Sequence, residues 1–311
     1  MDPPEHGRYR RLASSAFTPN HVARLEGRIR ELARARLARV RDRDYFDFAE
    51  DYAAAVPNDV VCGMVGIPQR DWDLIRADTD RLSQRGDGSV ERGDGPKAAA
   101  LRLATYFVEL VSDLRRRPKD NLTSQMIEGR VDGRKITPSE VVAFLFLVIS
   151  AGNESTGKTL GNAWYHGWLH PDVKHAGLNG RAEDWAAETL RYDSGNQLTV
   201  RELTQDTVLH DTRLRAGVRI AILHGSANRD DRVFPDPDAY DLDRDLSKTI
   251  SFGRGPHHCL GAPLARLEMR IALEEVSALL SDYEVDAANA QRVHCANQRG
   301  FASLPCRAVW R

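Results

Sequence analysis

One short segment of this chain carries reactive side chains at a spacing that could do chemistry. Residues 252–261 read Phe-Gly-Arg-Gly-Pro-His-His-Cys-Leu-Gly. Cys259 therefore lies four residues after a Gly-x-Gly turn and directly after two histidines. An amphipathic segment begins at about Ala262, and we expect the amides at its N-terminus to face the sulfur and lower the thiol pKa. A thiolate held in a glycine turn is a metal ligand or a nucleophile.

The residues alone leave three other interpretations of Cys259 open. A cysteine in a globular protein is most often a buried free thiol. Zinc could bind through His257, His258 and Cys259, but such sites need a second ligand pair at short spacing, and the other three cysteines do not supply one. A papain-like nucleophile would require a different local sequence.

The segment resembles the haem-ligand loop of the cytochrome P450 family, the haem-thiolate monooxygenases. It matches Phe-Gly-x-Gly-x-His-x-Cys-x-Gly at every defined position. The resemblance implies that Cys259 ligates the iron of haem b and that Phe252 packs against the thiolate. Gly253 and Gly255 would permit the turn, and amides after the cysteine, including that of Gly261, would tune the iron potential by bonding the sulfur.

A second motif lies in a long helix. Thr137-Pro-Ser-Glu140 is a capping box, which predicts a helix from there to about His170. Residues 152–159 within it also match the P-loop pattern Gly-x-x-x-x-Gly-Lys-(Ser/Thr). A P-loop requires a preceding strand and a second apolar strand ending in a magnesium-binding Asp, and the latter is not found. A P-loop NTPase therefore remains the distant alternative.

The same stretch, Ala151-Gly-Asn-Glu-Ser-Thr156, resembles the family pattern Ala-Gly-x-(Asp/Glu)-Thr-Thr. The resemblance implies that Ala151 and Gly152 let the helix approach the macrocycle, and that Glu154, Ser155 and Thr156 form the catalytic segment. The Ser155 hydroxyl can bond the Ala151 carbonyl and bend the helix, and with Glu154 it can relay protons. Serine replaces the usual threonine and lacks the β-methyl that restricts the rotamer, so we expect looser proton delivery.

Two further sets of residues resemble family features. Glu188 and Arg191, three residues apart on one helix face, would join Arg244 in a buried ionic network with a structural role. The haem propionates would be held by His6, Arg10, Arg201 and His257. A basic patch for an acidic electron donor would consist of Arg254, Arg266 and Arg270.

Composition sets broad limits. The chain has 311 residues, 41% of them hydrophobic, and a net charge of −1, which gives no argument for nucleic acid or an anionic membrane. Four scattered cysteines favour a reducing compartment, and the longest apolar run, residues 141–151, is too short to cross a bilayer. We therefore expect a cytoplasmic protein.

The elements that must position these residues are mostly helices. We expect a helix capped by Asp2, a second opened by Thr18, and further helices at 22–40, 96–117, 122–127 and 181–192. A Gly- and Asp-rich loop is predicted at 86–95. Short strands are predicted at 197–204, 207–210, 213–214 and 219–223. The fold class is mostly α with a small β-sheet region.

By resemblance, residues 1–311 form a single cytochrome P450 domain. Its parts are a helix-rich region at 1–192, a small β region at 197–223, the haem-ligand loop and helix at 250–281, and C-terminal strands at 283–311. Residues 2–12 match a helix well inside the family pattern, so we expect an N-terminally truncated fold with a substrate pocket open on one side.

The resemblance implies an oxidoreductase of soluble bacterial type. It would insert one oxygen atom from O2 into an apolar substrate, with electrons from a separate ferredoxin-type partner. A peroxide-driven peroxygenase and a degenerate haem-binding protein are the nearer alternatives. Phe144, Val148, residues 194–197 and Phe301 are candidate pocket residues, and they do not identify a substrate.

Overall fold

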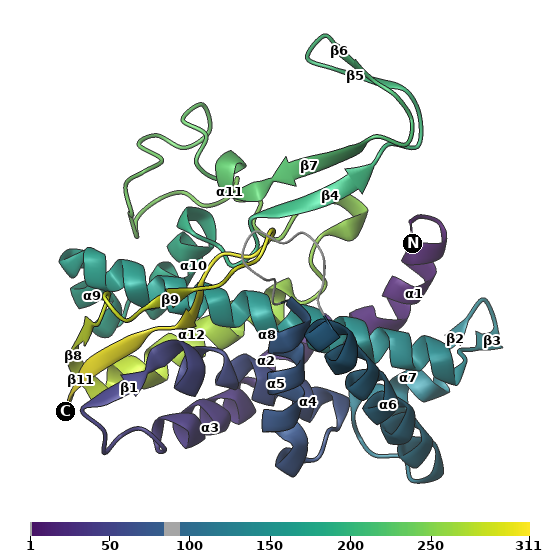
Figure 1. Cartoon of the computed structure of the whole chain (residues 1–311), viewed down its shortest axis with the longest axis horizontal. Coiled ribbons are helices and arrows are strands. Elements are labelled where there is room, and N and C mark those ends of the chain that lie inside the picture. The colour runs from purple at the N-terminus through teal and green to yellow at the C-terminus, as the bar shows by residue number, and fades with distance from the viewer. Residues whose placement is uncertain (1, 84–93) are drawn as a thin grey trace.

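The structure, a computed structural model, describes residues 2–83 and 94–311 (Figure 1). Its α-helices are α1 (Glu5–Ser14), α2 (Pro19–Ala23), α3 (Glu26–Leu37), α4 (Ala55–Val65), α5 (Trp72–Ser83), α6 (Asp94–Arg116), α7 (Leu122–Glu128), α8 (Pro138–Leu169), α9 (Pro171–Leu178), α10 (Ala182–Tyr192), α11 (His224–Ala227) and α12 (Ala262–Leu279). Short 3₁₀ turns are η1 (Ser15–Phe17), η3 (Gln69–Asp71) and η4 (Gly255–His257), and η2 (Phe48–Ala53) is a π-helix.

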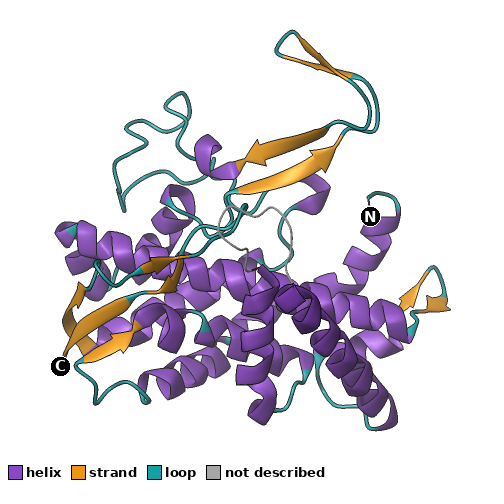
Figure 2. Cartoon of the chain, in the orientation of Figure 1, coloured by secondary structure: helices purple, strands orange, loops and turns teal. Residues whose placement is uncertain are grey.

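The strands form small antiparallel sheets at the periphery of the helices (Figure 2). They are β1 (Tyr45–Asp47), β2 (Arg130–Val131), β3 (Arg134–Lys135), β4 (Leu198–Glu202), β5 (Thr207–Leu209), β6 (Thr212–Leu214), β7 (Arg219–Leu223), β8 (Leu280–Val285), β9 (Gln291–Arg292), β10 (Phe301–Ser303) and β11 (Pro305–Trp310). One sheet has the order β1-β11-β8, and the pairs β4-β7, β5-β6, β2-β3 and β10-β9 complete the sheets of the described residues.

Helix α8 runs through the middle of the molecule and organises the core (Figure 1). It packs against α4, α5, α6, α10 and α12. Its N-terminus has the predicted capping box: the Thr137 side chain accepts from the Glu140 amide, and the Glu140 carboxylate accepts from the Thr137 amide at 2.6 Å. Both polar groups of the cap are thereby satisfied, which stabilises the start of the helix.

Each half of α8 belongs to a different apolar cluster. In the C-terminal half, the Trp164 ring stacks on Phe48 at 4.1 Å and on Tyr283 at 3.6 Å, and its neighbour Trp185 is also fully buried. In the N-terminal half, Leu145 and Ile149 are buried among side chains of α4, α6 and α12. Burial of this much apolar surface is the main stabilising term of the fold.

The predicted fold class is confirmed, and several local predictions need correction. Asp2 does not cap α1, because the helix begins at Glu5 and the Asp2 carboxylate bonds His257 instead. Thr18 caps α2 as predicted, but a break after Ala23 divides the expected helix at 22–40. Helices α5 and α9 were not predicted. Of the loop predicted at 86–95, residues 86–93 lie outside the residues that the structure describes.

The P-loop alternative is wrong, because residues 152–159 lie within the continuous helix α8 and follow no strand. Phosphate cradling by a P-loop needs a strand, then a loop, then a helix start. Among the described residues, no helix has the length and apolar character to cross a membrane.

Candidate active site

The loop before α12 presents Cys259 in a compact turn. The Cys259 amide donates to the Phe252 carbonyl at 2.8 Å, and the His258 amide donates to the Gly255 carbonyl at 3.0 Å. Gly253 and Gly255 have φ angles of 70° and 72°, a region that strains residues with a Cβ. The two glycines therefore permit the turn, as predicted, and the turn leaves the Cys259 side chain exposed.

The electrostatics of Cys259 differ from the prediction. Desolvation raises the pKa of the Cys259 thiol, although the residue as a whole is exposed. The amides of Gly261 and Ala262 at the start of α12 act in the opposite direction and lower the pKa, as do the charges of Arg10 and Arg266. The expected net lowering of the pKa is wrong, because desolvation outweighs these groups. A coordinated metal ion deprotonates such a thiol outright.

The four residues predicted to hold propionates converge from three parts of the chain. The His6 and His257 rings lie 4.1 Å apart, and desolvation, His257 and Arg10 together lower the pKa of His6. His257 Nε2 lies 2.8 Å from the Asp2 carboxylate. Both His257 and the charge of Arg201 on β4 stabilise that carboxylate and help to lower its pKa.

These observations test whether haem would fit. A basic cluster that already pairs with one carboxylate has the chemistry to bind propionates. The exposed Cys259 sulfur, with amide donors behind it, is the donor that a haem-thiolate iron requires. On α8, Leu147 is 62% exposed and Ala151 is exposed as well, and this apolar stripe would be open to a flat ligand. The residues of this site therefore fit haem.

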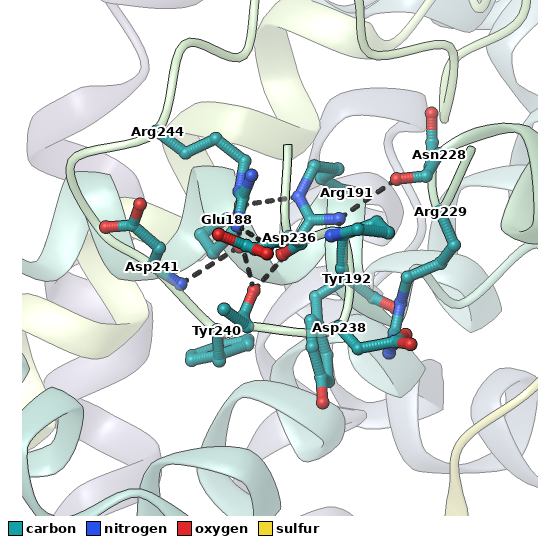
Figure 3. A network of polar contacts seen from close by, with 12 residues as sticks. Glu188, Arg191, Tyr192, Asn228, Arg229, Asp236, Asp238, Tyr240, Asp241 and Arg244 are labelled. Atoms are coloured by element: carbon teal, nitrogen blue, oxygen red, sulfur yellow. Dashed lines mark hydrogen bonds and ion pairs between the residues drawn. The ribbon is translucent and has the colours of Figure 1, made fainter. Parts of the chain in front are cut away.

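The predicted ionic network is present beside this site (Figure 3). Arg191 donates Nε and Nη2 to the Glu188 carboxylate at 2.9 and 2.6 Å, and both side chains are fully buried. Arg244 Nε lies 3.4 Å from the same carboxylate. The two guanidinium groups also donate to carbonyls of the loop from 228 to 239, namely those of Asn228, Pro235, Asp236, Pro237 and Ala239. The network thus anchors the chain that leads to the Cys259 loop.

The distal segment of α8 has the expected hydroxyl contact. Ser155 Oγ donates to the Ala151 carbonyl at 3.4 Å, a long and therefore weak hydrogen bond. Thr156 is buried at 5% exposure. A Cβ at Gly152 would lie 2.9 Å from Val61 of α4. The glycine is thus required by the approach of α4, which differs from the expectation that it faces the macrocycle.

Three contacts at this segment were not predicted, and two of them join residues that are distant in the sequence. Gln298 donates an amide hydrogen bond to the Glu154 carboxylate. Thr159 Oγ1 donates to the Ser155 carbonyl at 2.7 Å and accepts from the Gly195 amide at 2.8 Å. These partners lie 36 or more residues apart along the chain, except for Ser155 and Thr159. Only the i, i+4 pair could have been found from helical spacing.

Two other predictions change. Arg270 is paired with Glu26 and Glu274, so it adds no unpaired charge to the predicted donor-docking patch, whereas Arg254 and Arg266 are exposed. Phe301 is buried at 3% in the core and lies under the Arg292 guanidinium, so it does not line an open pocket.

The comparisons with known proteins agree with this geometry. A sequence model of the family described as "Cytochrome P450" matches residues 184–309. The chain is 42% identical over 308 residues to a putative cytochrome P450 123 of Mycobacterium tuberculosis, covering 98% of this chain and 77% of that protein. It is 34% identical over 295 residues to a methyl-branched lipid omega-hydroxylase of the same organism, covering 91% of this chain and 68% of that protein.

Solved structures show the same relationship. Cytochrome P450 CYP109Q5 from Chondromyces apiculatus superposes with a TM-score of 0.91 at 32% identity, covering 100% of this chain and 78% of that chain. The chain therefore belongs to the cytochrome P450 family and is an enzyme of the monooxygenase class. Membership implies haem as the cofactor.

Proposed function

We propose that residues 1–311 act as one haem-thiolate monooxygenase domain that inserts an oxygen atom from O2 into an apolar organic substrate. The observation that carries the proposal is Cys259, an exposed free cysteine in a glycine turn directly before α12, where the Gly261 and Ala262 amides favour the thiolate. No other cysteine of the described residues combines exposure with such donors: Cys62 and Cys306 are buried, and Cys295 bonds Asn297.

When bound, the haem would supply an iron centre that binds and activates dioxygen. Cys259 would hold the iron, with Phe252 packed behind the loop and the Gly261 amide on the sulfur. The propionates would be held by His6, Arg10, Arg201 and His257. On the distal side, Glu154 would hold a proton at its carboxyl group and Ser155 would pass it on through Oγ.

The electron source would be a separate ferredoxin-type partner that docks near Arg254 and Arg266, since a basic surface attracts an acidic donor. All four cysteines are unpaired, which supports a reducing compartment such as the cytoplasm. The names of relatives support an apolar chain as substrate: one is a methyl-branched lipid omega-hydroxylase, and a similar structure is titled P450BioI in complex with a hexadec-9Z-enoic acid ligated acyl carrier protein.

The decisive measurement is the spectrum of the reduced protein with carbon monoxide. We expect a red-shifted Soret band of thiolate type in the wild type and in Cys295→Ser, the matched control at a partly exposed thiol. Cys259→Ser should lose this band, because its hydroxyl cannot supply the thiolate ligand. A thiolate spectrum that persists in Cys259→Ser would contradict the proposed ligand.

Turnover then separates the haem functions. Product formation with a supplied ferredoxin system supports the monooxygenase, product formation with peroxide alone supports the peroxygenase, and a thiolate spectrum without either supports a binding protein. Ser155→Thr should release less hydrogen peroxide per electron consumed than the wild type, because the added β-methyl restricts the hydroxyl. Unchanged release would count against the proposed role of Ser155.

A further inference from the structure

A cavity of about 690 Å³ lies next to the distal segment of α8 and has no role in the mechanism above. It is bounded by η2, α5, α8 and the hairpin formed by β9 and β10, elements that lie close together around the middle of α8 (Figure 1). Gln298, which donates to Glu154, is one of its lining residues, and so is Lys158, one helical turn after Glu154. The cavity therefore borders the segment proposed to move protons.

Three of the lining side chains, Lys158, Arg76 and Arg292, are cations without an ionic hydrogen bond among the described residues. Arg292 donates to Asn162 Oδ1 at 3.2 Å and lies over the Phe301 ring, whereas the other two donate to backbone carbonyls. Lys158 Nζ donates to the Phe301 carbonyl at 3.1 Å, and Arg76 Nη1 donates to the Glu50 carbonyl at 2.7 Å. Within residues 2–83 and 94–311, neither of these two cations donates to a carboxylate, and the Arg76 Nε is buried without a hydrogen-bond partner. Each retains donor capacity that a negatively charged group would satisfy.

The apolar stripe of α8 leads from this cavity along the helix. Lys158, Ala151 and Leu147 are spaced so that they lie on one side of the helix, with Ser155 between the first two. Seven residues separate Lys158 from Ala151, which is about 10 Å at 1.5 Å per residue. Leu260, the neighbour of Cys259, packs against the same apolar cluster as Phe144 and Val148 of this helix. The stripe thus runs from Lys158 to Ala151, the residue that the family pattern places against the macrocycle.

We propose that this cavity binds the carboxylate end of a long-chain acid, with Lys158 and Arg76 as its charge partners, while the hydrocarbon lies along the stripe of α8. The inference rests on the proposed function and specifies its substrate class. It also implies that oxidation occurs at carbons remote from the carboxylate, because about 10 Å of helix separates Lys158 from Ala151.

The acidic residues that line the cavity would weaken the binding of an acid. Glu50 and Asp80 also line it, and their carboxylates would repel an acid. Glu50 is exposed and uses its backbone carbonyl for Arg76, so its side chain can be neutralised without removing that contact. Glu50→Gln should therefore strengthen the binding of an acid by about twofold, opposite in sign to the loss of a cation.

The test is calorimetric titration of the haem-loaded protein with dodecanoate, 1-dodecanol and methyl dodecanoate, which share a chain and differ in charge. We expect dodecanoate to bind at least about tenfold more tightly than the two neutral probes. Lys158→Met should weaken dodecanoate by about ten- to hundredfold, the range of a hydrogen bond to a charged group, and change 1-dodecanol by less than about threefold. Lys158→Arg should retain tight binding of dodecanoate.

Controls distinguish a specific effect from misfolding. Lys135→Met removes an exposed lysine that pairs with Glu128 far from this cavity, and it should leave all affinities unchanged. Equal affinity for dodecanoate and 1-dodecanol in the wild type, or an equal loss for both in Lys158→Met, would overturn the proposal. The carbon monoxide spectrum is read separately: its failure would refute the role of Cys259, whereas calorimetry alone decides the carboxylate site.

Discussion

A buried acid in α12 gives the sharpest test of the physical reasoning. Glu268 is 1% exposed, and its Oε1 has no hydrogen-bond partner among the described residues. Burial raises the pKa of Glu268 well above its ordinary value of 4.5, because no cation or donor offsets the loss of hydration. The side chain is therefore protonated in the folded protein at pH values where it is ionised in the unfolded chain.

The sign of the effect on stability follows from proton binding. Below about pH 4.5, Glu268 is protonated in both the folded and the unfolded state, and its contribution to the free energy of unfolding is fully present. As the pH rises from there towards the folded pKa, that contribution is lost, because only the folded state still holds the proton. The loss amounts to about 1.4 kcal/mol per pH unit in that window. Glu268→Gln preserves the shape and cannot titrate. We expect the unfolding free energy of the variant, relative to the wild type, to rise between pH 5.5 and pH 6.5, by on the order of 1 kcal/mol at most.

The assay is urea unfolding followed by far-ultraviolet circular dichroism at both pH values, with equal haem content in each protein. Glu109→Gln, at an exposed position of α6, is the matched control and should change the unfolding free energy by less than about 0.5 kcal/mol. A difference between Glu268→Gln and the wild type that is the same at both pH values, or that falls with pH, would refute a protonated, desolvated Glu268.

Three further predictions concern the framework of the site. Glu188→Gln should lower the unfolding free energy by about 3–5 kcal/mol and reduce haem retention, because two buried guanidinium groups would then face a neutral amide; a loss below about 1 kcal/mol in urea unfolding would contradict this. Gly195→Ala should cost about 1–3 kcal/mol and increase peroxide release, since its Cβ would lie 2.3 Å from the Ser155 carbonyl oxygen; unaltered release would mean that Ser155 does not depend on this contact. Gly27→Ala, where a Cβ meets no atom within 4 Å, should instead raise the unfolding free energy by about 0.4–1 kcal/mol, and a fall in its urea midpoint would oppose that expectation.

Local sequence rules predicted the elements whose signals are local. The capping box at Thr137, the Thr18 cap and the glycines at 253 and 255 were all identified correctly, because each depends on residues within a few positions. Predictions failed where a side chain had a choice between a local partner and one distant in the sequence. Asp2 could have capped a helix but bonds His257, which is 255 residues away in the sequence.

Long-range packing explains the remaining differences. Gly152 is a glycine because Val61 of α4 approaches it, and the sequence gives no sign of which helix lies there. Likewise, the pKa of Cys259 depends on how many atoms of the loop and α12 surround the sulfur, and desolvation outweighs the amide donors that the sequence predicted correctly.

The sequence by itself indicated the arrangement at Cys259, since a thiol between a glycine turn and a helix start is local and specified by the chain order. It also indicated the acids and hydroxyls of α8 and the charges of the ionic network. The tertiary structure decided how these groups are connected: Gln298 donates to Glu154, the Gly195 amide donates to Thr159 Oγ1, which itself bonds the Ser155 carbonyl, and Lys158 lines a cavity with Arg76. Such contacts join segments that are distant along the chain, and only the packing of α8 against its neighbours brings them together.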